Sequence, residues 1–200
     1  MLKIENKAIH VVDGAIAQPM VDGLFEYAVA SCRTGWRYGD VADAKYSTNP
    51  FWGATVMSEE RHGTDDPHTI DETPEIFQQL WQRLQQGLQP FRFTLRDIFI
   101  NGQTYGMENA IHTDCPHDEE GWYTVLIYVN PKWHVDWGGE TVFYNKARTD
   151  PMYAVLPKPG RILFFDARHH HWGRAPTRNT QDLRVTVAFC LTRAEDSPAP

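Results

Sequence analysis

Residues 160–176 read GRILFFDARHHHWGRAP, and this stretch decides the fold class that the sequence predicts. Its first half contains RILFFD at 161–166, a short apolar and aromatic run after a Pro-Gly pair, which is typical of a β-strand. Its second half holds three adjacent histidines. Since neighbouring side chains of a strand leave opposite faces, His169 and His171 are expected to point one way and His170 the other.

Four further runs of the same kind surround this stretch. They are FTLRDIFI at 93–100, WYTVLIYV at 122–129, ETVFY at 140–144 and LRVTVAFCL at 183–191. Asn-Gly and Gly-Gly pairs mark turns between such runs. The runs have no helical segments between them for parallel crossovers, so we expect an antiparallel sheet that closes on itself as a barrel or jelly roll.

The first ninety or so residues have a different pattern, which indicates helices and loops. Apolar residues recur at spacings of three and four over 18–31 and 73–88, as in amphipathic helices that pack on a sheet. Thr73 and Pro74 are suited to the start of the second helix. The irregular stretch 33–72 between them is rich in Gly, Asp, Thr and Ser. We expect it to line or cover the site entrance, or to be a surface loop held by its aromatic residues.

The composition is consistent with a single domain, and it excludes few classes of protein. The chain has 200 residues, 42% of them hydrophobic, and a formal net charge of -7 that is spread along the chain. No basic face suggests a nucleic-acid partner. The three cysteines are far apart, as expected of thiols in a reducing compartment, and no apolar run is long enough to span a bilayer. We therefore expect a cytoplasmic protein without a membrane or nucleic-acid partner.

A candidate metal site begins at His112 and Asp114, two residues apart. In an extended segment both side chains leave the same face, so one short element supplies two ligands. With His169 or His171 as the third ligand, the set is two imidazoles and one carboxylate. This facial triad holds non-haem Fe(II) and leaves positions open on the other side of the metal.

Arg184 lies a short way beyond the histidines and begins a strand. Residues 184, 186, 188 and 190 form a polar-to-small face of that strand, and the residues between them form an apolar face. A barrel interior that admits a small ligand would use the small face. The planar guanidinium group can hold a carboxylate through two parallel hydrogen bonds. The residues thus indicate an iron-dependent oxygenase with an acidic co-substrate.

Residues 92–193 resemble the 2-oxoglutarate- and Fe(II)-dependent dioxygenases of the prolyl-4-hydroxylase-like group. The blocks that carry the resemblance occur in the same order, and they are NGQTYGMENAIHTD, YTVLIYVNPKW, WGGETVFY, GRILFFDARHHHWGRAP and LRVTVAFCL. The resemblance implies a mainly β fold of the α+β class, a double-stranded β-helix (jelly roll, cupin-like) buttressed by N-terminal helices. Residues 1–200 would form one dioxygenase domain, with a support layer at 1–90, a jelly-roll core at 91–193 and a tail at 194–200.

The resemblance also implies roles for single residues. It selects His171 as the third iron ligand, and it assigns the distal carboxylate of 2-oxoglutarate to Arg184. His112, Asp114, His171 and Arg184 are then the residues on which catalysis depends. Tyr128 is a second expected contact of the co-substrate and Thr124 a third, with ordinary packing in the barrel as the alternative for both.

Five more polar residues have weaker expected roles. Asn101 and Tyr105 lie near the position where related enzymes place another contact to the co-substrate. Arg174 could meet an acidic group of the substrate, although a surface arginine beside a turn is the alternative. His169 and His170 could orient His171 or lie exposed at a strand end.

The implied reaction depends on Fe(II) as cofactor and ascorbate as a reductant, consumes 2-oxoglutarate and O2, and releases succinate and CO2. We expect hydroxylation of an unactivated C–H bond in a small molecule such as an amino acid or secondary metabolite. Desaturation and demethylation are variants, and a peptidyl-prolyl or other protein hydroxylase is the alternative. Because Asp114 is present, halogenation is disfavoured. A zinc-dependent hydrolase or a non-catalytic binding barrel are alternatives from other classes. The sequence indicates neither the oxidised carbon nor the oligomeric state.

Overall fold

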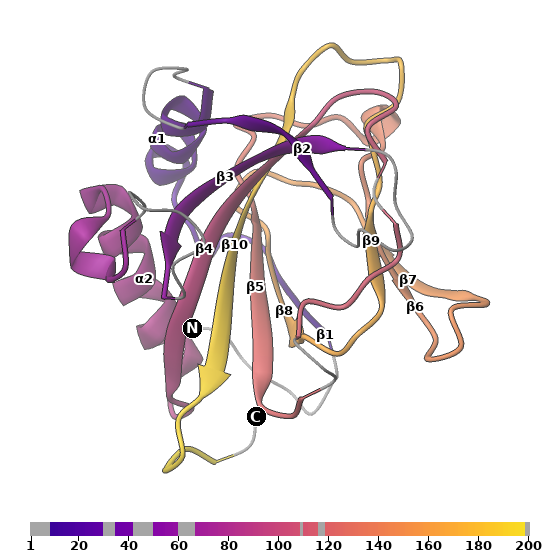
Figure 1. Ribbon diagram of the computed structural model, residues 1–200. Coiled ribbons are helices and arrows are strands. Elements are labelled where there is room, and N and C mark those ends of the chain that lie inside the picture. Colours follow the sequence, from indigo (N-terminus) through magenta and orange to yellow (C-terminus); the bar gives the residue numbers. More distant parts are fainter. Residues whose placement is uncertain are drawn as a thin grey trace.

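The computed structural model describes residues 9–29, 35–41, 50–59, 67–108, 110–115 and 119–198. Its strands form a seven-stranded sheet in the order β1-β8-β5-β10-β4-β3-β2 and a three-stranded sheet in the order β7-β6-β9. Every strand pair in both sheets is antiparallel. The two sheets face each other, and helices α1 and α2 lie on the far side of the larger one (Figure 1).

The elements have the following bounds in chain order. They are β1 (Ile9–Val12), α1 (Gln18–Val29), β2 (Arg37–Asp40), β3 (Phe51–Ser58), η1 (Ile70–Glu72), α2 (Glu75–Leu88), β4 (Phe93–Gln103), β5 (Trp122–Tyr128), η3 (Val135–Trp137), β6 (Thr141–Tyr144), β7 (Pro151–Val155), β8 (Ile162–Asp166), β9 (His171–Gly173) and β10 (Arg184–Arg193). This arrangement is the predicted double-stranded β-helix buttressed by helices, so the fold class is confirmed.

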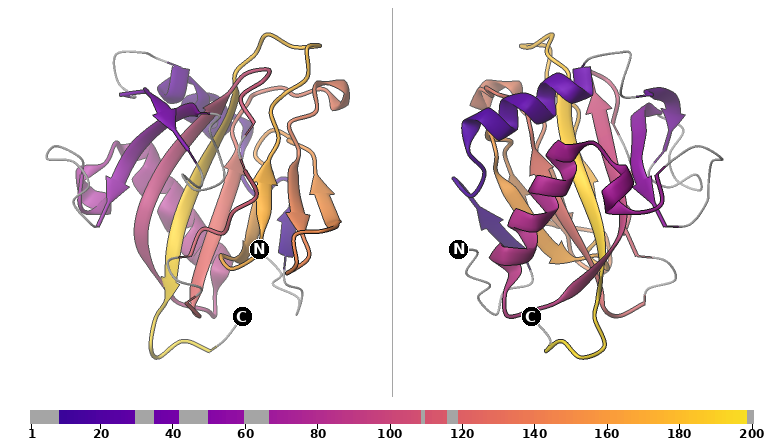
Figure 2. Two further views of the ribbon diagram at one scale, coloured as in Figure 1. Left: turned by 45° about the vertical axis from the view of Figure 1, so that its right-hand side comes forward. Right: turned by 90° about the vertical axis from the view of Figure 1, so that its left-hand side faces the viewer.

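The two predicted helices cover one face of the larger sheet (Figure 2). On α2 the apolar stripe that the sequence predicts is buried, with Phe77, Leu80 and Leu84 at most 2% exposed. The start of α2 differs from the expectation. The Thr73 hydroxyl donates to the carbonyl of Ile70 instead of capping the helix, because a short 3-10 turn precedes α2 and ends at Glu72.

The larger sheet has two chemically different faces, and β10 shows the division most clearly. Val185, Val187, Phe189 and Leu191 are buried in the core under the helices. The alternate residues Arg184, Thr186, Ala188 and Cys190 line a cavity on the opposite face. The alternation in the sequence predicts this division, since the side-chain period of a strand is two.

A second, smaller core joins the two sheets. Tyr128, Leu163 and Phe165 of the larger sheet pack with Phe143 and Val155 of the smaller one. The ring centroids of Phe143 and Phe165 are 5.0 Å apart in an edge-on arrangement. These contacts hold the smaller sheet against the larger one at the side of the cavity.

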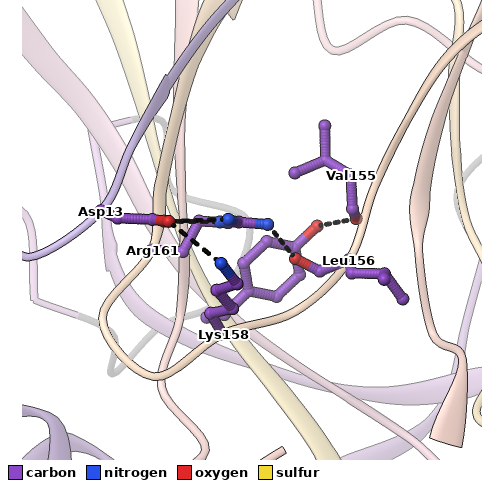
Figure 3. Close-up of polar contacts among 6 residues, drawn as sticks. Asp13, Val155, Leu156, Lys158 and Arg161 are labelled. Carbon is purple, nitrogen blue, oxygen red and sulfur yellow. Dashed lines mark hydrogen bonds and ion pairs between the residues drawn. The ribbon is translucent and has the colours of Figure 1, made fainter. Parts of the chain in front are cut away.

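An ion-pair cluster fastens the edge strand β1 (Figure 3). Asp13 directly follows β1, and its two carboxylate oxygens accept from Nε and Nη2 of Arg161 at 2.6 and 2.8 Å. Lys158 Nζ lies 3.4 Å from the same carboxylate. Nη1 of Arg161 donates to the carbonyl of Leu156, so the cluster joins β1 to the turn that precedes β8.

The strands β1, β2 and β3 lie within the first ninety residues and were not predicted. The helical and loop-rich layer therefore also extends the larger sheet at both edges. None of the helices in the described ranges is long and apolar enough to cross a membrane. A cytoplasmic location stays a prediction. Cys32, residues 42–49 and residues 60–66 lie outside the described residues.

Candidate active site

Two short segments bring the three predicted iron ligands together. His112 forms an isolated antiparallel bridge with His171, the first residue of β9. The backbone N–H of each donates to the carbonyl of the other, at 3.0 and 2.9 Å. The N–H of Asp114 donates to the carbonyl of Ala167 at 2.9 Å. The segment 110–115 is therefore held by backbone hydrogen bonds, although it is not a regular strand.

The ligand atoms form a compact group that fits one metal ion. His112, Asp114 and His171 each offer one ligand atom, and these atoms lie within 4.8 Å of one another. Asp114 Oδ1 is 3.4 Å from His112 Nε2 and 3.5 Å from His171 Nε2. Among the described residues this is the only group of three such side chains at metal-binding distances.

Backbone carbonyls fix which ring nitrogens are available to a metal. His112 Nδ1 is 2.9 Å from the carbonyl oxygen of Ala110, and His171 Nδ1 is 3.0 Å from that of His169. A carbonyl oxygen only accepts hydrogen bonds, so in each neutral ring Nδ1 carries the proton and Nε2 carries the lone pair. Such second contacts orient imidazole ligands in metal sites. Both Nε2 atoms face Asp114, as iron binding requires.

Thr124 of β5 orients the carboxylate ligand. Its hydroxyl donates to Asp114 Oδ2 at 2.7 Å, which leaves Oδ1 toward the imidazoles. Burial alone would raise the pKa of Asp114, but the two imidazoles and the Thr124 hydroxyl hold this pKa well below its usual range. Burial lowers the pKa of His171 to about 4. At neutral pH the site therefore offers an ionised carboxylate and a neutral His171 imidazole, which are the protonation states that bind a metal.

Arg184 lies on the cavity face of β10 and is only 2% exposed. Its Nε donates to the carbonyl of Gly139 at 2.7 Å and its Nη1 to Gln103 Oε1 at 2.9 Å. Its Nη2 is 3.3 Å from Thr141 Oγ1. A guanidinium group has five N–H donors, and these three contacts leave two for a ligand. No carboxylate of the described residues forms an ion pair with Arg184, and burial lowers its pKa.

The Gly-Gly pair before β6 is required by this arrangement. Gly138 and Gly139 have φ angles of 63° and 77°, which side chains disfavour. A Cβ atom on Gly139 would lie 3.0 Å from Cδ of Arg184 and 3.3 Å from a ring carbon of Trp133. Glycine thus lets the backbone approach the guanidinium closely enough for the Gly139 carbonyl to accept its hydrogen bond.

A cavity of about 350 Å³ joins the triad to Arg184. Its lining includes all three candidate ligands and Arg184, and most of the rest is neutral. Asp40, Val41 and Phe51 also line it, so part of the 33–72 segment does lie at the site. The cavity is within the size range of small-ligand sites.

The other expected co-substrate contacts lie at different distances from the cavity. Asn101 lines it. Tyr128 is buried behind it, where its hydroxyl donates to Thr141 Oγ1 at 2.6 Å and its ring lies 5.3 Å from Arg184 Cζ. Thr124 contacts Asp114 instead of the cavity. Tyr105 is 54% exposed and its ring lies under the guanidinium group of Arg178, away from the cavity lining.

The neighbouring histidines and Arg174 do not line the cavity either. The backbone carbonyl of His169 orients the His171 ring. His169 and His170 line a separate groove together with Thr113. Arg174 is paired with Glu108 at 3.2 Å and lies over the ring of Trp172.

Sequence reasoning missed Gln103 and Thr141, which hold Arg184 in place. Gln103 is directly opposite Arg184 in the β10–β4 register and is 1% exposed. Its amide nitrogen donates to the carbonyls of Met107 and Gly173, which fixes its oxygen toward the guanidinium. The signal that would have identified Gln103 is the strand register, and a single sequence does not provide it.

A double-stranded β-helix that holds two imidazoles and a carboxylate beside a buried arginine defines a non-haem metal-dependent oxygenase. Residues 100–191 match the model of the 2OG-Fe(II) oxygenase superfamily. This match and the group formed by His112, Asp114 and His171 indicate a dioxygenase that uses Fe(II), 2-oxoglutarate and O2. No curated protein matches the chain in sequence.

Solved structures share this fold at low sequence identity. A prolyl hydroxylase from Trichoplax adhaerens, in complex with a hypoxia inducible factor peptide fragment, has a TM-score of 0.64 and 17% identity over 94% of this chain and 84% of that one. A 2OG-Fe(II) oxygenase family oxidoreductase from Burkholderia pseudomallei has a TM-score of 0.66 and 14% identity, over 94% of this chain and 86% of that one. The epimerase SnoN from nogalamycin biosynthesis has a TM-score of 0.65 and 13% identity, over 92% of this chain and 77% of that one.

Proposed function

We propose that this oxygenase hydroxylates an unactivated C–H bond of a small molecule and converts 2-oxoglutarate to succinate and CO2. His112, Asp114 and His171 would hold the iron. The observation that carries the proposal is Arg184, a buried cation beside these ligands that forms no ion pair with a described carboxylate, although the charge of Glu140 acts on it from a distance. A buried charge without a counter-ion is costly, so a carboxylate ligand is the natural complement.

The surroundings of Arg184 support a specific pose of the co-substrate. Its two free N–H groups would bind the distal carboxylate of 2-oxoglutarate, and the keto acid end would face the iron ligands. Asn101 lines the same cavity and is proposed as a further contact. Tyr128 would act indirectly, because the Thr141 hydroxyl accepts hydrogen bonds from both the Tyr128 hydroxyl and Arg184. Bound iron supplies the oxidation chemistry with O2, while these residues bind and orient.

The size of the cavity supports a small substrate. About 350 Å³ must hold the co-substrate as well, which leaves room for a metabolite of modest size next to the iron ligands. Asp114 retains the carboxylate ligand, which supports hydroxylation over halogenation. A protein hydroxylase is the alternative, since one solved relative in fold was crystallised with a peptide fragment.

Anaerobic absorption spectroscopy tests the proposed co-substrate site. Addition of 2-oxoglutarate to the Fe(II)-loaded protein should produce a visible metal-to-ligand absorption band. Arg184→Ala should raise the 2-oxoglutarate concentration for half-maximal band formation about 100-fold, because a buried charge partner is lost. Iron affinity should change far less.

Arg178→Ala is the matched control, because Arg178 is exposed and outside the cavity lining. It should leave the titration unchanged. The absence of any band in the unaltered protein would refute the proposed function. Equal weakening of iron and 2-oxoglutarate binding in Arg184→Ala would show that Arg184 is structural.

A further inference from the structure

Asp40, the last residue of β2, places a carboxylate at the cavity and has no assigned role. The residue is exposed to solvent, and it lines the same cavity as the iron ligands and Arg184. It belongs to the short edge strand β2, which pairs only with β3. Tyr38 of β2 packs on Trp52 of β3, with ring centroids 5.1 Å apart, so the strand is anchored on its neighbour.

The local backbone turns Asp40 toward the cavity. The β2–β3 register shifts between Tyr38 and Asp40, and Gly39 between them has a φ of 120°. A bulge of this kind changes the direction of the side chain that follows it. The Asp40 carboxylate lies over Gly53 of β3, where a Cβ atom would be only 2.1 Å from Asp40 Oδ2. Only a residue without a side chain leaves space for the carboxylate there.

The sheet register gives the position of this carboxylate relative to the rest of the site. Gly53 is opposite Asn101 of β4, and Asn101 is opposite Thr186 of β10. Both Asn101 and Thr186 line the cavity. Neighbouring strands are about 4.8 Å apart, so the carboxylate over Gly53 is roughly 10 Å across the sheet from the strand that carries Arg184. It is thus well placed to contact a second molecule beside the co-substrate.

No cation of the described residues neutralises Asp40. Partial burial of the carboxyl by its neighbours raises its pKa, and a hydrogen bond from the backbone N–H of Val41 opposes this. The other charged residues of the cavity lining already have partners or proposed ligands. Asp114 faces the imidazoles, and Arg184 faces the co-substrate. Asp40 is therefore the one charge of this lining that is left for the substrate.

We propose that Asp40 binds a positively charged amine or guanidinium group of the primary substrate, and that the substrate is a cationic molecule. A carboxylate and an ammonium or guanidinium group form a charge-assisted hydrogen bond that fixes orientation as well as adding affinity. Asp40 is a specificity-determining residue that positions the C–H bond near the iron ligands. The inference rests on the proposed function, because it assigns the substrate class of the same site.

Substrate binding is tested with the Fe(II)- and 2-oxoglutarate-loaded protein under anaerobic conditions. The probes are L-lysine, L-ornithine, L-arginine, putrescine, glucosamine and a capped lysyl tripeptide. The controls replace each cationic group that could meet Asp40 with an uncharged one, and they are the side-chain N-acetyl derivatives of lysine and ornithine, citrulline for arginine, diacetylputrescine and N-acetylglucosamine. Binding is read as a shift of the visible absorption band, and turnover as substrate-dependent succinate formation in air. At least one cationic probe should shift the band and stimulate succinate formation, and its uncharged control should not.

Two variants test the role of Asp40 itself. Asp40→Asn keeps the shape and removes the charge, and it should raise the apparent Kd of the active amine about tenfold. Gly53→Ala should do the same without changing Asp40, because the added methyl group displaces the carboxylate. Asp71→Asn removes one exposed carboxylate outside the cavity lining and should leave the Kd unchanged. Formation of the absorption band in each variant shows that the protein is folded and loaded.

The outcomes separate this inference from the proposed function. If no band forms with iron and 2-oxoglutarate, the proposed function fails. If the band forms but only neutral or anionic compounds shift it, or none of the cationic probes does, the amine inference is overturned. An unchanged Kd in Asp40→Asn overturns it as well. Activity with the lysyl tripeptide alone would support the cationic group and contradict a small-molecule substrate.

Discussion

Thr124 joins the β-sheet to the proposed metal ligand Asp114 through one hydrogen bond of 2.7 Å. Thr124→Val has nearly the same volume but lacks the hydroxyl, so Asp114 loses the contact that directs Oδ1 toward the imidazoles. We predict that its affinity for Fe(II) falls about tenfold or more, as is usual when an outer contact of a metal ligand is removed. Anaerobic calorimetric titration with Fe(II) measures this. Thr124→Ser restores the hydroxyl and should restore affinity; equal losses in both variants would contradict the assignment.

The adjacent histidines are predicted to differ sharply in importance. His171→Ala removes a ligand atom and should abolish both stoichiometric iron binding and succinate formation, as should His112→Ala and Asp114→Ala. His169→Ala keeps the backbone carbonyl that orients His171, and it should therefore retain most iron binding. His170→Ala should retain most turnover. Loss of iron in His169→Ala together with its retention in His171→Ala would reverse the ligand assignment.

At the scale of elements, the Asp13–Arg161 pair attaches the edge strand β1 to the turn before β8. The hydrogen bond and charge of Arg161 hold the pKa of Asp13 below its ordinary value. A carboxyl whose pKa is lowered by folding stabilises the protein above its unfolded pKa of about 3.9, and this stabilisation is lost as the pH falls through the folded value.

Asp13→Asn should therefore lower the free energy of unfolding by about 0.5–1 kcal/mol at neutral pH, a modest amount because Asp13 is half exposed. The difference from the unaltered protein should shrink below about pH 4. Urea denaturation at pH 7, 5 and 3.5 measures it, with Asp71→Asn as an exposed control. A difference that is independent of pH would show that the lost stability is not ionic.

Element by element, the sequence predicts the central strands better than the edges. β4, β5, β8 and β10 have apolar runs because helices cover one of their faces, and these runs are visible in the sequence. The edge strand β2 is exposed along its whole length, and its sequence RYGD has no apolar run. The strand β9 has three residues and is formed by its pairing with β6, which the sequence alone does not reveal.

At the scale of the whole molecule, the helices form a core that is separate from the active site. Leu80 of α2 is fully buried between helix and sheet. Leu80→Ala should destabilise the protein by about 2–5 kcal/mol, since a large cavity is left in this core. Thermal and urea unfolding measure the loss. Iron binding of the folded fraction should be unchanged, and an equal loss of iron affinity would show that the two faces of the sheet are coupled.

The site was predictable as a set of chemical groups but not as a set of contacts. His112, Asp114, His171 and Arg184 occur in motifs that local sequence reveals, and the structure brings all four to one cavity. Gln103, Thr141 and Gly139 were not foreseen because their role is to fix Arg184 from β4, from β6 and from the turn before β6. Asp40 was not foreseen either, since its direction depends on a bulge and on the space above Gly53.

The attachment of β2 to β3 alone has a consequence for how substrate selectivity can be altered. The residues proposed to hold iron and co-substrate are carried by β4, β9, β10 and the 110–115 segment, whereas Asp40 is carried by an edge strand outside them. Replacement of β2 would leave the hydrogen-bond ladders of β9 and β10 intact, because β2 pairs only with β3. Residues 37–41 can therefore be varied without changing the strands that carry the proposed iron and co-substrate contacts. A library of variants at these five positions is the smallest that we expect to yield altered substrate selectivity.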